Sequence, residues 1–230
     1  MSRTLKYDIP GEDPRITLSE VLEIGWMAAF DAARGVSAEG GADASRARRR
    51  VLEIGFGRGE FLLDMAAKAP EVDFVGIEVS FKRTLKMARK VARAKLSNVR
   101  LLEGPAETAL PEVFPPGSLD EIWVNFSDPW PKVRHGHRRV IQPAFVANAA
   151  QALAPDGRLY LATDDVPYAH QMNEVLRAQD ALQNCYAPWP FLPEVEGRMQ
   201  TGYEEQWRAE GRPMHFFTYA KRMATAQGSA

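Results

Sequence analysis

The chain has 230 residues and a mass of 25.7 kDa, and 45% of its residues are hydrophobic and 26% charged. This composition excludes a disordered or fibrous protein, and the single cysteine, Cys185, excludes an intramolecular disulfide and a cysteine-based zinc site. The net charge is −1, yet residues 46–140 hold 18 basic and 12 acidic side chains, so this middle segment favours a polyanionic partner.

Residues 1–50 are expected to form an N-terminal extension, because residues 35–47 are small and polar and read as a flexible linker with basic residues at its end. Residues 51–222 are expected to form one domain, and residues 223–230 a flexible tail. The first thirty residues lack a signal-peptide pattern, and no apolar run is long enough to span a membrane. We therefore expect a cytoplasmic protein that is a monomer or a homodimer.

Short β-rich runs alternate with helical patterns along the domain. The strand candidates are Arg50–Gly55, Asp73–Glu78, Val99–Glu103, Glu121–Phe126 and Arg158–Thr163. The helical stretches begin near Glu60, Ser80, Pro143 and Val166. Strands separated by such helices predict right-handed crossovers and a mostly parallel sheet with helices on both faces. In such sheets ligands bind at the carboxyl ends of the strands.

A glycine-rich run follows the first strand. Glycines at positions 55, 57 and 59 let a ligand approach the backbone, and Glu53 precedes them. The dinucleotide fingerprint would place its third glycine at position 60, where this chain has Glu60, so a nicotinamide dehydrogenase is disfavoured. Acidic residues suit a cationic ligand such as S-adenosylmethionine; the alternative is a tight turn that binds nothing.

Acidic side chains also follow the next strands. Glu78 ends the second strand and is spaced to accept the hydroxyls of an adenosine ribose, although it could be a surface carboxylate. Asp128 precedes a Pro-Trp-Pro corner that contains Trp130, where it could bind the N–H edge of a planar base. Trp130 could stack on that base or pack as a structural corner. Asp164 follows the fifth strand and faces the same cleft.

Two basic features border this cleft. Lys132, Arg134, His135, His137, Arg138 and Arg139 form a patch after Trp130. The arginines suit phosphate contacts, while the two histidines lack a matching ligand cluster, so we expect no metal. The helix after Glu78 places Lys82, Lys86, Arg89, Lys90 and Arg93 on one face. Arg46, Arg48, Arg49 and Arg50 form a further cluster.

Taken together, these residues resemble the bacterial tRNA (guanine-N7)-methyltransferase family. The most specific match is NFSDPWPKVRHGHRR at residues 125–139, which is similar to the family pattern F-P-D-P-W-x-K-x-R-H-x-K-R-R. The L-E-I-G-F-G-x-G run at residues 52–59, the G-I-E at 76–78 and the T-G-Y-E at 201–204 are also similar. The resemblance covers about residues 51–221.

The resemblance implies a Rossmann-like class I methyltransferase fold, whose seven-stranded sheet ends in an antiparallel hairpin from residues 181–187 and 214–220. It implies methyl transfer from S-adenosylmethionine to N7 of a guanosine at position 46, in the variable loop of tRNA. By resemblance, Glu53, Glu78 and Asp128 contact the cofactor together with the glycine run, and Asp128 is the catalytic residue. Guanosine is bound by Lys132, Asp164, Thr201, Gly202, Tyr203 and Glu204, and tRNA phosphates by Arg134, Arg138 and Arg139.

Four positions depart from the family pattern. Ser127 stands where a proline is usual, His137 where a lysine is usual and Gln206 where a basic residue is common. Pro105 replaces an acid or asparagine that would contact the cofactor adenine, and Glu107 is a candidate substitute. Two other functions therefore stay open: a small-molecule methyltransferase on the same fold, and an RNA-binding protein with a vestigial cofactor site.

Overall fold

A computed structural model describes residues 8–35 and 48–223 of the chain. Apart from Gly35 and Met223, the predicted flexible linker at 35–47, with Arg46 in it, and the predicted tail at 223–230 lie outside the described residues.

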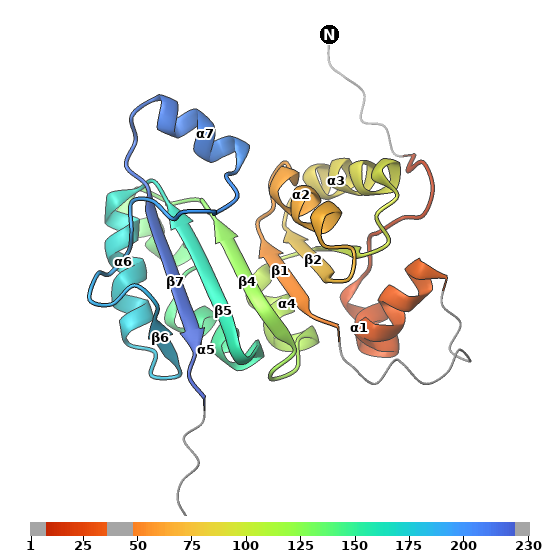
Figure 1. The fold of residues 1–230 in the computed structure, drawn as a ribbon, viewed down its shortest axis with the longest axis horizontal. Helices are drawn as coiled ribbons and strands as arrows, with labels where there is room; N and C mark the ends of the chain where they lie inside the picture. The colour runs from red at the N-terminus through yellow and green to blue at the C-terminus, as the bar shows by residue number, and fades with distance from the viewer. Residues whose placement is uncertain (1–7, 36–47, 224–230) are drawn as a thin grey trace, which may run out of the picture.

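One sheet of seven strands forms the centre of the molecule (Figure 1). Its strands are β1 (Arg50–Ile54), β2 (Asp73–Glu78), β3 (Val99–Glu103), β4 (Leu119–Asn125), β5 (Leu153–Thr163), β6 (Leu182–Asn184) and β7 (His215–Lys221). Their spatial order is β3-β2-β1-β4-β5-β7-β6; the pairings of β7 with β5 and with β6 are antiparallel and the other pairings are parallel. The predicted parallel sheet with a C-terminal antiparallel hairpin is confirmed, although β4 and β5 begin earlier than predicted.

Helices cover both faces of the sheet. They are α1 (Leu18–Arg34), α2 (Glu60–Lys68), α3 (Phe81–Ala94), α4 (Ala106–Val113), α5 (Pro143–Ala152), α6 (Val166–Arg177) and α7 (Gly202–Ala209), with a 3-10 helix η1 (Val133–Arg138). Helices α2 and α3 pack on one face, whereas α1, α4, α5 and α6 line the other (Figure 1). The four predicted helix starts are confirmed within one residue; α1, α4 and α7 were not predicted.

The alternation of side chains along β1 decides where Glu53 points. Leu52 and Ile54 belong to the core on the α4–α6 side, whereas Val51 belongs to the core beneath α2 and α3. Since alternate residues of a strand face opposite sides, Glu53 lies on the α2 side with Val51, at the carboxyl end of the strand. Its neighbour in register on β4 is Trp123.

Helix α1 contributes to the core on the α4–α6 side of the sheet. Pro14 accepts a hydrogen bond from the Leu101 amide, so the segment before α1 lies along the outer edge of β3. The Trp26 ring is buried and its Nε1 donates to the Val113 carbonyl at 2.7 Å. Arg100 points inward and binds Glu12 at 2.8 Å, so it does not belong to a cationic surface.

The described arginines before β1 are paired with acids. Arg48 lies 3.4 Å from Asp31, and Arg49 lies 2.6 Å from Glu121. Arg50 is largely buried beside Asp73. These residues sit at the amino end of β1, opposite the carboxyl edge where ligands bind, so this cluster is better explained by ion pairing than by RNA contact.

Within residues 8–35 and 48–223, no helix has the length and hydropathy of a membrane-spanning segment. The same residues contain no group of three or more His, Cys, Asp or Glu side chains that could hold a metal ion.

Trp26→Ala should lower the free energy of unfolding by about 3 kcal/mol, because it removes a large buried ring and strands a buried carbonyl. Leu22→Ala is the matched control, since Leu22 lies on the same helix with 63% of its surface exposed, and should change that free energy by less than about 0.5 kcal/mol. Urea unfolding of both variants measures the difference. Equal effects would show that α1 does not belong to the cooperative core.

Candidate active site

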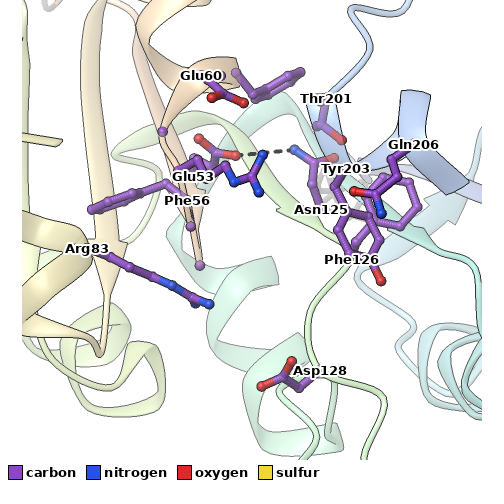
Figure 2. A pocket seen from close by; sticks show the side chains of 16 residues that line it. Glu53, Phe56, Glu60, Arg83, Asn125, Phe126, Asp128, Thr201, Tyr203 and Gln206 are labelled. Atoms are coloured by element: carbon purple, nitrogen blue, oxygen red, sulfur yellow. Dashed lines mark hydrogen bonds between the residues drawn. The ribbon is translucent and has the colours of Figure 1, made fainter. Parts of the chain in front are cut away.

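A cavity of about 330 Å³ lies at the carboxyl ends of β1 and β4, beneath the beginning of α7. It brings together eight residues predicted from the sequence: Glu53, Gly55, Gly57, Gly59, Asp128, Thr201, Gly202 and Tyr203 (Figure 2). The same cavity is lined by Phe56, Glu60, Arg83, Asn125, Phe126 and Gln206, to which the sequence motifs assigned no binding role.

The glycine run turns the chain sharply from β1 into α2. Gly55, Gly57 and Gly59 all have positive φ, at 70°, 54° and 75°. A Cβ on Gly59 would lie 2.1 Å from the Met87 sulfur, so a side chain here would displace Met87 of α3 and also strain the backbone at its positive φ. A Cβ on Gly55 would meet no atom within 4 Å, because this residue borders the cavity.

Glu78 supports the glycine run from behind. Its Oε2 accepts the backbone N–H of Gly57 at 3.0 Å, and its Oε1 accepts that of Ser80 at 3.1 Å. Arg83 lies 3.5 Å from the same carboxylate. Glu78 is therefore placed beside the cavity but is not among the residues that line it, and its predicted contact with a ribose stays a prediction.

Glu53 is the most unusual group in the cavity. Its side chain is 2% exposed, and burial raises the pKa of its carboxyl group to about 8. Asn125 Nδ2 donates to its Oε1 at 3.4 Å, whereas its Oε2 has no hydrogen-bond partner within the described part of the chain. A buried carboxylate oxygen without a partner is costly, so this atom is suited to a cationic ligand.

The loop after β4 holds Asp128 in strained backbone. Phe126 and Trp130, on either side of it, have φ of 51° and 43°, a left-handed conformation that is rare for bulky residues. The Tyr168 hydroxyl accepts the Ile141 N–H at 3.1 Å and lies 3.3 Å from Ser127 Oγ. Asp128 itself is exposed and makes no hydrogen bond or ion pair with any described residue, so its carboxylate is available to a ligand.

The basic patch divides into supporting and available cations. Arg138 lies over the Trp130 ring at 5.0 Å. Arg139 donates to the Pro129 carbonyl at 2.7 Å and also binds Gln171. These contacts give Arg138 and Arg139 a part in holding the loop. Lys132 and Arg134 are exposed, have no such contacts within the described residues, and lie outside the cavity.

Helix α7 presents part of the T-G-Y-E motif to the cavity and turns the rest away. The Thr201 hydroxyl caps the helix by accepting the Glu204 N–H at 3.0 Å. Tyr203 lines the cavity and packs between the rings of Phe126 and Trp207. Glu204, in contrast, is 1% exposed and binds Arg198 and Arg208. It lines a separate cavity, so the structure does not place it against a guanosine in the site described here.

Asp164 lies near this helix but outside the cavity. Its carboxylate accepts a hydrogen bond from Arg212 at 2.8 Å, and Arg212 stacks 3.4 Å from the centre of the Trp207 ring. Arg212 thus occupies one oxygen of Asp164, and the predicted contact of Asp164 with guanosine stays a prediction.

The cationic face of α3 is partly used inside the protein. Lys90 donates to the Arg58 carbonyl at 2.8 Å and so anchors the glycine run. Lys82, Lys86 and Arg93 are exposed. Near the following strand, Pro105 precedes α4 and Glu107 is exposed in its first turn; neither lines the cavity.

Sequence comparisons identify relatives over most of the chain. The model of the family described as "Putative methyltransferase" matches residues 47–217. A tRNA (guanine-N(7)-)-methyltransferase of Alkalilimnicola ehrlichii is 42% identical over 173 residues, which cover 75% of this chain and 73% of the relative. One of Chromohalobacter salexigens is 36% identical over 92% of each chain. The chain belongs to the tRNA (guanine-N7)-methyltransferase family. The family predicted from the motifs is thereby confirmed.

Solved structures agree with this membership at the level of the fold. The 16S rRNA methyltransferase KamB is 19% identical, with a TM-score of 0.57 over 80% of this chain and 96% of that one. TrmN from Thermus thermophilus is 21% identical, with a TM-score of 0.54 over 85% of this chain and 49% of that one. The class I methyltransferase fold is thus confirmed, and members of the tRNA (guanine-N7)-methyltransferase family use S-adenosylmethionine as the methyl donor.

Sequence reasoning missed the residues that connect parts of this site. Asn125 begins the most specific motif, so its place in that motif was the available signal. Arg83 belongs to the noted run of basic residues, but nothing distinguished it from its neighbours. Arg198 lies in a Pro- and Gly-containing segment, and no local spacing relates it to Glu53 or Asn125.

Glu53→Gln should become increasingly stable relative to the wild type as the pH rises. The pKa of Glu53, about 8 in the folded protein, exceeds the ordinary value of about 4.3 expected after unfolding, so the folded state binds the extra proton between these limits. The wild type therefore loses stability there, by up to about 1.4 kcal/mol per pH unit, and the glutamine variant does not. Urea unfolding between about pH 5.5 and 7.5 measures this difference; parallel pH profiles would contradict it.

Proposed function

We propose that this protein transfers the methyl group of S-adenosylmethionine to N7 of a guanosine in tRNA. The observation that carries the proposal is the Glu53 carboxylate, which is buried at the end of β1 with one oxygen unpartnered inside the cavity. The cofactor supplies an electrophilic methyl group on a sulfonium, together with a cationic amino group. Because the pKa of Glu53 is about 8, its carboxyl group is largely protonated at neutral pH without a ligand, and a cationic group beside it would favour the ionised form.

Different residues around the cavity would contact different parts of the cofactor. Glu53 would attract its positive charge, and the open backbone at Gly55 and Gly57 would let it lie against the chain. Glu78 would accept ribose hydroxyls in place of the Arg83 contact, while keeping its bond to the Gly57 amide. Arg83 is an exposed side chain on α3, so it can move aside.

Methyl transfer to guanine N7 needs no deprotonation, because this nitrogen carries a lone pair in the plane of the ring. The protein therefore contributes mainly alignment and electrostatic stabilisation. Asp128 is the group we propose for both roles, because its carboxylate lines the cavity and has no competing partner among the described residues. It would bind the N–H edge of the guanine and favour positive charge developing on the base. Tyr203 would bound the base from the α7 side.

The tRNA would be held outside the cavity. Lys132 and Arg134 are the exposed cations next to the Asp128 loop, and Lys82, Lys86 and Arg93 extend the positive surface on α3. Thr201 and Gly202 would place α7 at the guanosine, with Asp164 and Glu204 supporting it through Arg212, Arg198 and Arg208. The proposed mechanism uses no residue of a second chain, and we propose the cytoplasm as the compartment because the proposed substrate is tRNA.

Asp128→Ala should reduce kcat/KM for tRNA methylation by about 100-fold or more, because it removes the group that orients the base and offsets its developing charge. Asp64→Ala is the matched control and should retain near wild-type turnover, since Asp64 is exposed on α2 and does not line the cavity. The assay uses labelled S-adenosylmethionine and tRNA from a strain lacking the modification, followed by borohydride and aniline cleavage at N7-methylguanosine. Normal turnover of Asp128→Ala would refute the proposed site.

The same assay separates the other two functions. Label in a small acceptor without tRNA would favour a small-molecule methyltransferase. Absence of cofactor binding by calorimetry, with RNA binding retained, would favour an RNA-binding protein.

The double variant Lys132→Ala/Arg134→Ala should raise the KM for tRNA by about 10-fold or more and leave the Kd for S-adenosylmethionine unchanged. It should also reduce the slope of log Kd for tRNA against log salt concentration by about 2, because two phosphate contacts are lost. Lys68→Ala/Arg177→Ala removes two cations at the far ends of α2 and α6 and is the control. An equal effect of both double variants would indicate a loss of general positive charge only.

A further inference from the structure

A continuous chain of polar side chains runs from the cavity to α7. Asn125 Nδ2 donates to Glu53 Oε1 at 3.4 Å, and Asn125 Oδ1 accepts from Arg198 Nη2 at 2.6 Å. The other arm of the Arg198 guanidinium, Nη1, binds Glu204 Oε2. Arg208 completes the chain by donating to Glu204 Oε1 at 3.0 Å. Figure 2 shows the first of these bonds between Asn125 and Glu53.

Arg198 is the centre of this chain and is deeply buried. Its side chain is 8% exposed, and its guanidinium lies 4.5 Å from the centre of the Phe216 ring. Each arm of the fork has a different partner, one on β4 and one on α7. A planar guanidinium can satisfy two such acceptors at once, whereas a lysine ammonium is a single point charge.

The orientation of Asn125 depends on this contact. A carboxamide presents an oxygen at one end and an NH₂ group at the other, so an acceptor contact with Arg198 turns the donor end toward Glu53. With Arg198 absent, the carboxamide oxygen would be buried without this donor, and the amide could rotate away from the carboxylate.

We propose that Arg198 is a positioning residue, which holds Asn125 against Glu53 with one arm and α7 above the cavity with the other. The cofactor carboxylate and the substrate-side helix are thereby placed by one buried guanidinium. The role assigned to Glu53 in cofactor binding rests on the function proposed above; the positioning of Glu53 by Arg198 can be measured without any ligand.

The charged surroundings of Glu53 make its ionisation a direct readout of this contact. Burial opposes the ionised form most strongly, Asn125, Arg198 and the Leu62 backbone N–H on α2 favour it, and Glu78 on β2 opposes it. The other titratable groups that line the cavity are Arg58, Glu60, Arg83, Asp128 and Tyr203. Removing the Arg198 charge while leaving these groups in place should move the titration of Glu53 to higher pH.

The experiment is a ¹³C-carboxyl NMR titration of the full chain, in which the Glu53 resonance is identified by its loss in Glu53→Gln. Arg198→Gln should raise the Glu53 midpoint by about one pH unit, because an attractive charge and the orientation of Asn125 are lost. Arg198→Lys keeps the positive charge, so the rise of the Glu53 midpoint in this variant should be at most half of the rise in Arg198→Gln. Hydrogen exchange of the α7 amides should accelerate about 10-fold in Arg198→Gln.

Arg208→Gln is the matched control, because Arg208 shares Glu204 with Arg198 but has no contact with Asn125. It should leave the Glu53 midpoint unchanged. An unchanged midpoint in folded Arg198→Gln, or the same shift in Arg198→Gln and Arg208→Gln, would overturn the proposal. If Arg198→Gln does not fold, the contact between Asn125 and Glu53 is tested with Asn125→Ala, which should raise the Glu53 midpoint. An unchanged Glu53 midpoint in that variant would also overturn the proposal.

Calorimetry with S-adenosylmethionine on the wild type separates this inference from the proposed function. Cofactor binding without a shift of the Glu53 midpoint in Arg198→Gln refutes the positioning role and leaves the function standing. A shift of that midpoint without cofactor binding supports the positioning role and refutes the function.

Discussion

The burial of one carboxylate at the end of a central strand governs the design of this site. Removing Glu53 from water raises the pKa of its carboxyl group to about 8, because Asn125, Arg198 and the Leu62 backbone N–H offset the effect of burial only in part. The remaining oxygen stays unsatisfied within the described structure. In the function proposed above, a cationic ligand beside this oxygen would favour the ionised form of Glu53.

The same balance applies to the loop that carries Asp128. Its two left-handed aromatic residues, Phe126 and Trp130, adjoin positions that are contacted from outside the loop: Ser127 by the Tyr168 hydroxyl, and the Pro129 carbonyl by Arg139. The contact between Ser127 and Tyr168 ties this loop to α6.

Local sequence patterns predicted those features of the site that are determined by residues close together in the chain. The glycine turn and Glu53 are examples, since backbone freedom and strand alternation are encoded over a few positions. The roles of Arg198, Arg100 and Glu204 depend on partners far along the chain, and a single sequence does not state such pairings. Residue spacing also could not show that the Arg138 guanidinium lies over the Trp130 ring. Nor could it show that Arg48, Arg49 and Arg50 each form an ion pair with an acidic residue. Helix α1 was missed because Gly25, with a φ of 76°, interrupts its pattern.

The N-terminal segment along β3 has a consequence for how this protein behaves at high concentration. An outer strand with free amides and carbonyls is a template on which another chain can add itself, and natural sheets cover or shorten such strands. Here the segment around Pro14 and Ile16 occupies the β3 side. At the opposite side the last strand, β6, has only three residues. The N-terminal segment therefore occupies backbone groups of Leu101 on β3 that a strand of another molecule would otherwise pair with, and the short β6 offers few such groups at the opposite side.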